Sequence, residues 1–159
     1  MKKLAILKDE EFLPAAKKLI NQARTAVFIS SFKIELSTKR RGAKLAEIFY
    51  LLKDKARDGL DVRVLTNKQN EQGYVPHTNA YVINYLKKNG VSVKCLPNNR
   101  ICHAKMIIVD NEAAIIGSHN LSIKSCHNNF EMALLATDLI IVSTLKGYFI
   151  SGWLTGKDA

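Results

Sequence analysis

Apolar positions along the chain follow two patterns that alternate. Phe12, Ala16 and Ile20 recur at helical spacing, whereas other stretches are short continuous or alternating apolar runs. Helical spacing predicts helices over 12–23, 43–58 and 79–88 and around Leu145, Phe149 and Trp153. Apolar runs predict strands over 26–32, 61–66, 91–96, 101–109, 113–116 and 130–137. This order favours the α/β class, with a mixed β-sheet flanked by helices on both faces.

Length and composition are typical of one globular domain over residues 1–159. Of the 159 residues, 47% are apolar and 24% are charged, as in ordinary soluble domains. These values exclude a disordered chain, a collagen-like repeat and a miniprotein held together by disulfides. No apolar run approaches the roughly 20 residues that a membrane-spanning helix needs. We therefore expect a single domain with a hydrophobic core.

The charge balance is strongly basic. Lys and Arg number 24 against 14 Asp and Glu, which gives a formal net charge of +10. Such an excess favours a polyanionic partner, with nucleic acid first and an anionic membrane surface second. A basic surface without a specific partner is the alternative interpretation.

Cysteine usage and the N-terminus bear on the cellular compartment. Cys95, Cys102 and Cys126 are too few, and odd in number, for a disulfide framework, so buried thiols in a reducing environment are expected. The apolar stretch from Leu4 to Leu7 is too short for the core of a signal peptide. We expect a cytoplasmic protein, or a periplasmic or secreted one if a leader has been removed.

Residues that carry chemistry are concentrated between positions 103 and 131. His103 and Lys105 lie two apart on an expected strand, so both side chains emerge on the same face. Gly117 permits a tight turn, after which Ser118 and Asn120 offer short polar side chains beside exposed backbone amides. Together these groups predict a phosphate-binding cradle. An imidazole within it is placed to attack phosphorus or to protonate a leaving oxygen.

The spacing of these residues is that of a known signature. The pattern His-x-Lys-x4-Asp-x6-Gly-Ser-x-Asn resembles that of the phospholipase D superfamily. Its fixed positions are occupied here by His103, Lys105, Asp110, Gly117, Ser118 and Asn120. Glu131 falls where that family places an acidic residue, and the segment 59–65 is similar to the family's helix-to-strand junction. The resemblance covers nearly the whole chain.

The resemblance implies a role for each of these residues. His103 would be the nucleophile that forms a phosphohistidine, and a second copy of it would be the general acid. Lys105, Ser118 and Asn120 would bind the non-bridging phosphate oxygens. Glu131 would hydrogen-bond the imidazole, whereas Asp110 and Gly117 would be structural. The family needs no metal and no cofactor for this chemistry, because its lysine and amide donors stabilise the developing charge.

The chain holds one copy of a motif of which this superfamily needs two at each active site. A twofold homodimer would bring two copies together. Single-motif chains of this length resemble the small metal-independent bacterial endonucleases of the superfamily. The expected function is therefore a nonspecific nuclease acting on DNA or RNA. The alternatives are a phospholipase or phosphatidyl-transfer enzyme, or a nucleic-acid-binding subunit of a larger defence or restriction assembly.

Other residues allow weaker interpretations. Basic side chains expected to grip a phosphate backbone are Lys39, Arg40, Arg41, Lys68 and Lys124. Phe32 and Tyr74 are candidates for stacking on bases, although packing within the protein is the more frequent fate of aromatics. His119 is expected to face solvent. A zinc site at Cys102–His103 is disfavoured because neighbours on a strand point to opposite faces.

Overall fold

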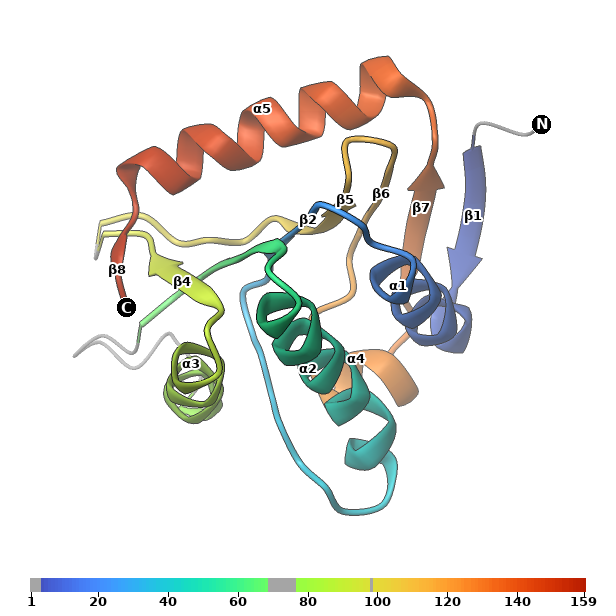
Figure 1. Ribbon diagram of the computed structural model, residues 1–159. Coiled ribbons are helices and arrows are strands. Elements are labelled where there is room, and N and C mark those ends of the chain that lie inside the picture. Colours follow the sequence, from blue (N-terminus) through green and yellow to red (C-terminus); the bar gives the residue numbers. More distant parts are fainter. Residues whose placement is uncertain (1–3, 69–76, 98) are drawn as a thin grey trace.

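The structure is a computed structural model that describes residues 4–68, 77–97 and 99–159 (Figure 1). Within these ranges one mixed sheet has the strand order β1-β7-β6-β5-β2-β3-β4-β8. The strands are β1 (Leu4–Lys8), β2 (Ala26–Ser30), β3 (Asp61–Thr66), β4 (Ser92–Cys95), β5 (Lys105–Val109), β6 (Ala113–Gly117), β7 (Met132–Ala136) and β8 (Lys157–Asp158). The helices are α1 (Phe12–Asn21), α2 (Arg41–Arg57), α3 (Thr78–Lys88), α4 (Ile123–His127) and α5 (Leu139–Thr155), with a 3-10 turn at Asp9–Glu11.

Helices cover both faces of the sheet, which confirms the expected α/β architecture. Figure 1 shows α5 crossing one face, with α1, α2 and α3 on the other. Successive side chains of β2 point to opposite faces of the sheet. Val27 and Ile29 pack in the core under α1–α3, and Phe28 packs in the core under α5. The Phe28 ring stacks on Phe149 of α5 with centroids 5.2 Å apart. Strand β2 is thus buried on both sides, as its continuous apolar run predicts.

Two strand predictions need correction. Strand β1, which the sequence analysis missed, is an edge strand in which most residues are exposed, so it lacks the apolar alternation of a half-buried strand. The strand expected over 101–109 begins only at Lys105. Before it, the Asn67 side chain accepts a hydrogen bond from the Cys102 amide at 2.7 Å and donates to its carbonyl at 3.0 Å. The Asn67 side chain, and not the backbone of a neighbouring strand, thus bonds to the Cys102 backbone, so the hydrogen-bond ladder of β5 does not extend back to His103.

Gly117 is needed for a close approach and not for the tight turn that the sequence suggested. Among the described glycines, positive φ values belong to Gly59 and Gly90. A Cβ atom on Gly117 would lie 2.5 Å from the Ala133 Cα and would also overlap the Met132 carbonyl. The missing side chain therefore lets β7 lie against the end of β6, beside the predicted catalytic residues.

Replacing Gly117 with alanine is expected to lower the free energy of unfolding by about 2–4 kcal/mol, because backbone atoms must move to admit the methyl group. Gly147 is the matched control, since it lies within α5 and nothing surrounds the site of its Cβ within 4 Å. Gly147→Ala should raise stability by about 0.5–1 kcal/mol. Urea unfolding measures both changes. Equal stability of Gly117→Ala and wild type would show that the close approach is not a constraint.

Candidate active site

The residues of the predicted phosphate cradle gather around one open cavity of about 420 Å³. Lys105 reaches it from the start of β5 and His103 from the segment just before that strand. Gly117, Ser118 and Asn120 reach it from the end of β6 and the segment that follows. Lys105 pairs directly with Gly117 in the β5–β6 ladder. The register of one hairpin thus brings the two halves of the motif together, in a volume typical of small-ligand sites.

His103 and Lys105 are neighbours, although His103 precedes the strand and is exposed. The Lys105 ammonium donates a 2.6 Å hydrogen bond to the His103 carbonyl, and partial burial lowers the pKa of Lys105. The Phe32 ring lies 5.5 Å from the His103 ring between centroids and 6.0 Å from the Lys105 ammonium. Phe32 thus belongs to the site as a packing partner of both residues.

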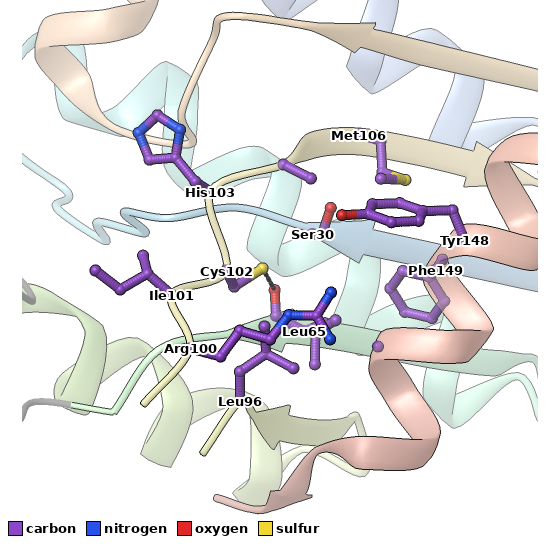
Figure 2. A pocket seen from close by; sticks show the side chains of 12 residues that line it. Ser30, Leu65, Leu96, Arg100, Ile101, Cys102, His103, Met106, Tyr148 and Phe149 are labelled. Atoms are coloured by element: carbon purple, nitrogen blue, oxygen red, sulfur yellow. Dashed lines mark hydrogen bonds between the residues drawn. The ribbon is translucent and has the colours of Figure 1, made fainter. Parts of the chain in front are cut away.

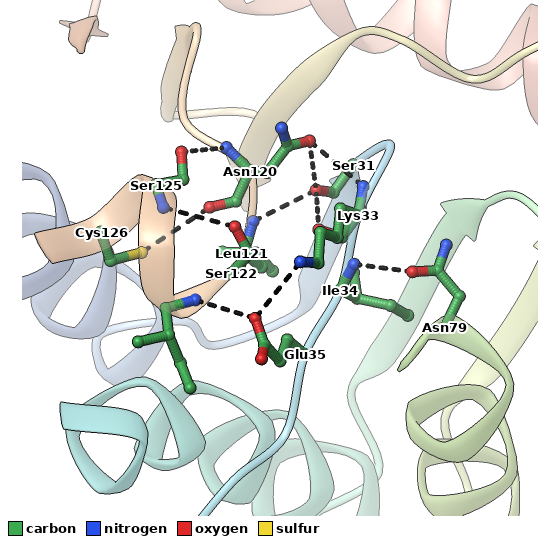
Figure 3. Close-up of polar contacts among 11 residues, drawn as sticks. Ser31, Lys33, Ile34, Glu35, Asn79, Asn120, Leu121, Ser122, Ser125 and Cys126 are labelled. Carbon is green, nitrogen blue, oxygen red and sulfur yellow. Dashed lines mark hydrogen bonds and ion pairs between the residues drawn. The ribbon is translucent and has the colours of Figure 1, made fainter. Parts of the chain in front are cut away.

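Asn120 is held by the loop that follows β2 (Figure 3). Its carbonyl oxygen accepts a hydrogen bond from the Lys33 amide at 3.2 Å and lies 3.4 Å from the Ser31 hydroxyl, whose proton is donated to the Lys33 carbonyl at 2.8 Å. Ser31 also accepts a 3.3 Å hydrogen bond from the Leu121 amide. Because the carbonyl oxygen is already bonded, the amide NH₂ is the group that Asn120 offers to a ligand. A donor is what a phosphate oxygen requires.

Glu131 lies beside Ser118 and is itself firmly held. Its carboxylate accepts hydrogen bonds from the Ser118 hydroxyl, the Ser125 hydroxyl at 2.6 Å and the Asn129 amide at 2.9 Å. Burial alone would raise the pKa of Glu131, but these hydrogen bonds outweigh it and hold the pKa below its ordinary value. The expected bond between Glu131 and the His103 imidazole is not among those formed by the described residues. Glu131 instead orients Ser118.

The backbone amides that follow β6 are used within the protein, contrary to expectation. The Ser118 amide donates to the Met132 carbonyl at 3.0 Å, the Asn120 amide to the Ser125 hydroxyl at 2.9 Å, and the Ile123 amide to Glu35 at 3.2 Å. These amides are therefore unavailable to a phosphate. Among the groups that line the cavity, the side chains of Lys105, Ser118 and Asn120 are the candidate donors to a phosphate, with Lys105 as the cation.

His119 is buried, so the expectation that it faces solvent is wrong. The residue is 2% exposed, and its ring stacks on Phe12 with centroids 4.3 Å apart. Its Nε2 donates to the Asp9 carbonyl at 3.0 Å, and burial lowers the pKa of the imidazole. The Asp9 carboxylate in turn accepts a 2.8 Å hydrogen bond from the Glu131 amide. His119 and Asp9 thus fix the backbone of Glu131, a function that no motif in the sequence indicated.

A family model described as cardiolipin synthase, PLD-like domain, matches residues 16–153. The chain belongs to the phospholipase D superfamily. Among curated proteins it is similar to the cardiolipin synthase of Halalkalibacterium halodurans, with 35% identity over 104 residues, or 65% of this chain and 20% of the relative. It is also 30% identical to the major cardiolipin synthase ClsA of Bacillus subtilis over 62% of this chain and 20% of the relative. The chain thus spans about a fifth of the length of these relatives.

Solved structures share the fold over nearly the whole chain. The family member Nuc from Salmonella typhimurium superposes with a TM-score of 0.81 and 20% identity, over 98% of this chain and 97% of Nuc. NucT from Helicobacter pylori gives a TM-score of 0.76 and 21% identity, over 99% of both chains. Phosphatidylserine synthase from Haemophilus influenzae gives 0.70 and 16%, over 92% of this chain and 35% of that one. These likenesses confirm the α/β fold.

The remaining motif residue, Asp110, is a structural anchor in this phospholipase D domain. Its carboxylate accepts hydrogen bonds from the backbone amides of Arg24, Thr25 and Ala26 at 2.7–2.9 Å and from the Thr25 hydroxyl at 2.9 Å. Burial by itself would raise the pKa of Asp110, but these four hydrogen bonds outweigh the effect of burial and hold the pKa below its ordinary value. Asp110 thus joins the β5–β6 turn to the connection between α1 and β2.

The more weakly predicted residues lie outside the cavity of this phospholipase D domain. Lys39, Arg40, Arg41 and Lys124 are exposed and do not line it, and Lys68 lines a separate depression near the end of β4. Their contact with a phosphate backbone stays a prediction. Tyr74 lies outside the described residues.

The three cysteines are buried and form no metal site with the described residues. Cys95, Cys102 and Cys126 are buried free thiols, and burial raises the pKa of each, to about 11, 11 and 12. Across residues 4–68, 77–97 and 99–159, no three His, Cys, Asp or Glu side chains come close enough together to hold a metal ion. Cys102 is buried whereas His103 is exposed, as expected for neighbours that point to opposite sides.

Proposed function

We propose that the chain cleaves or transfers phosphodiesters through a covalent intermediate on His103. The observation that carries the proposal is the single cavity lined by His103, Lys105, Ser118 and Asn120. The imidazole attacks phosphorus, and the leaving oxygen takes a proton from a second imidazole. Lys105 and the Asn120 NH₂ hold the non-bridging oxygens, and Ser118 joins them when its hydroxyl turns from Glu131.

The second imidazole comes from a second copy of the chain. Within the described residues, His103 is the one histidine that lines this cavity, whereas the reaction needs both a nucleophile and an acid. Phe130, which precedes Glu131, is 100% exposed, and Met132 beyond it is also largely exposed. These side chains give a second copy an apolar contact next to the cavity. A twofold arrangement would place two His103 side chains at one phosphate.

Subunit mixing tests the shared site. When wild type and His103→Ala are refolded together in equal amounts, half of the dimers are mixed and hold one imidazole. Activity should fall to about a quarter of that of the same total amount of protein as pure wild type, because only dimers with two imidazoles work. Independent sites would instead retain about half. Activity is then measured over several wild-type fractions. A shared site makes activity vary with the square of the wild-type fraction, whereas independent sites make it vary linearly.

Phospholipid headgroup diesters are the substrate class that we place first. The curated relatives that match this chain are named cardiolipin synthases, which favours the lipid alternative over the nuclease. The outer side of α5 adds support, since Leu139, Ile140 and Leu154 are exposed there. Because the chain as a whole also carries a net charge of +10, this apolar side of α5 suits an anionic lipid surface. No helix in the described part of the chain is long and apolar enough to cross a bilayer.

Nucleic acid is the second candidate substrate, and the net charge of +10 is the observation that favours it. One experiment compares the two. Wild type and His103→Ala are incubated in excess EDTA with anionic phospholipid vesicles and with single- and double-stranded DNA and RNA. Headgroup release by wild type alone would support the lipid class, and strand cleavage by wild type alone would support the nuclease. Turnover that survives in His103→Ala would contradict the proposed chemistry for either substrate.

A further inference from the structure

The backbone that leads into His103 is held by a buried side chain. Asn67, which directly follows β3, is 3% exposed. Its side-chain oxygen accepts a hydrogen bond from the Cys102 amide at 2.7 Å, and its NH₂ donates to the Cys102 carbonyl at 3.0 Å. That carbonyl belongs to the peptide bond between Cys102 and His103. One side chain therefore fixes both peptide groups of the residue that precedes the candidate nucleophile.

The side chain of Cys102 gives the same segment a further anchor. Cys102 is 4% exposed, and its thiol lies 3.6 Å from the Leu65 carbonyl oxygen of β3. Figure 2 shows the Cys102 side chain directed toward Leu65 and the His103 imidazole on the opposite side of the segment. Anchoring Cys102 on the inside thus leaves His103 on the outside, where it lines the phosphate cavity.

The aromatic ring beside His103 is held by the same side chain and by a second buried asparagine. The Asn67 NH₂ lies 3.3 Å from the Phe32 carbonyl oxygen, and the Phe32 ring centroid is 5.5 Å from that of His103. Asn79, in the first turn of α3, is fully buried, and its NH₂ donates to the same Phe32 carbonyl at 3.0 Å. Asn67 and Asn79 together are the asparagine clamp. It holds both the sequence neighbour of His103 and its ring partner.

Asn79 also connects the clamp to the other half of the phosphate cavity (Figure 3). Its side-chain oxygen accepts a hydrogen bond from the Ile34 amide at 3.0 Å. One residue earlier in the chain, the Lys33 amide donates to the Asn120 carbonyl oxygen at 3.2 Å. The loop after β2 is therefore bonded at neighbouring positions to the clamp and to the residue that offers its NH₂ to a phosphate.

We propose that Asn67 is a positioning residue for attack by His103 and that Asn79 supports it. The inference rests on the proposed function. Attack on phosphorus tolerates a displacement of the nucleophile of only about 0.5 Å, and His103 is exposed, so its neighbours must supply the restraint. Neither asparagine lines the cavity. Both act through the backbone of Cys102 and through Phe32.

Steady-state kinetics with bis(4-nitrophenyl) phosphate in excess EDTA test the proposal. Asn67→Ala should lower kcat about ten- to hundredfold, because the imidazole is no longer held in line with phosphorus. KM should stay within about threefold of wild type, because Lys105 and Asn120 keep their own contacts. Asn79→Ala should lower kcat about three- to tenfold, and it takes the place of Asn67→Ala if that protein does not fold. A folded variant with kcat within about twofold of wild type would overturn the proposal.

Asn89→Ala is the matched control. Asn89 follows α3 at its other end, where its side chain accepts a hydrogen bond from Arg57 at 3.2 Å and donates to the Tyr85 carbonyl at 2.8 Å. This substitution also removes an asparagine with two side-chain partners, but it leaves the surroundings of His103 unchanged. Its kcat should equal that of wild type even where its stability is lower. An equal loss of kcat in Asn89→Ala and Asn67→Ala would mean that lost stability explains both, and the proposal would fail.

Backbone dynamics separate failure of the clamp from failure of the proposed function. In ¹⁵N relaxation, the amides of Cys102 and His103 should have order parameters of about 0.85 in wild type and in Asn89→Ala, and below about 0.6 in Asn67→Ala. Unchanged order parameters in Asn67→Ala would overturn the clamp whatever the activity. A loss of order in Asn67→Ala, combined with no turnover by wild type, would support the clamp and overturn the proposed function.

Discussion

Replacing His103 with alanine is expected to lower phosphodiester turnover at least about 10⁴-fold, because the variant lacks the atom that attacks phosphorus. The fold should be unaffected. His103 is exposed and precedes β5, and its ring contact is with Phe32. The free energy of unfolding should therefore stay within about 0.5 kcal/mol of wild type. Steady-state turnover and urea unfolding, measured on the same preparation, give both values.

His77→Ala is the matched control for this variant. His77 is exposed, lies outside the cavity and makes no side-chain capping bond to α3. Its loss removes an imidazole without touching the site, so turnover should match wild type. A His103→Ala protein that is folded and retains more than about a hundredth of wild-type turnover would show that another group performs the attack.

Asp110→Ala is expected to lower the free energy of unfolding by about 2–4 kcal/mol. Three backbone amides and the Thr25 hydroxyl would lose their shared acceptor. The backbone adds to this loss, since Asp110 has a φ of 53°, a conformation that Asp and Asn tolerate better than alanine. Urea unfolding at neutral pH measures the change. Asp58→Ala, which removes an exposed carboxylate just after α2, should differ little from wild type.

The stability contributed by Asp110 should also depend on pH. Its pKa is lower in the folded protein than in the unfolded chain, so the stabilisation is complete above the unfolded value of about 4. It is lost as the pH falls through the folded pKa. The stability difference between wild type and Asp110→Asn should therefore shrink as the pH is lowered from about 5. A difference that stays constant down to acid unfolding would contradict the role assigned to the carboxylate.

The sequence predicted the candidate site well where the site depends on spacing. His103, Lys105, Ser118 and Asn120 were expected to meet, and the register that pairs Lys105 with Gly117 brings them to one cavity. Strand β3 was also correctly placed, because Val62 and Val64 alternate with the polar residues Asp61 and Arg63, the pattern of a strand with one face in the core. Local pattern and hairpin geometry are sufficient for these features.

Contacts between distant segments were not predictable in the same way. His119 is buried because α1 places Phe12 against its ring, and Asp9 meets Glu131 because β1 pairs with β7. Asn67 takes the place of a strand beside Cys102. Each of these contacts joins residues at least 35 positions apart in the sequence, and none leaves a periodic signal in it. The Ile123 amide was misassigned for the same reason, since its acceptor is the distant Glu35. The Ser118 and Asn120 amides bond instead to Met132 and Ser125, which lie close by in the sequence but carry no signal of these contacts.

The stereochemistry of transfer at phosphorus tests the central claim most directly, because it reports a covalent intermediate that need not accumulate. A phosphorothioate diester with a single configuration at phosphorus is transferred to methanol in excess EDTA, and the configuration of the product is determined. Attack by His103 followed by attack by methanol involves two inversions, so the account predicts retention of configuration, with no product from His103→Ala. Inversion would mean that methanol attacks the substrate directly, and it would contradict a phosphohistidine on His103.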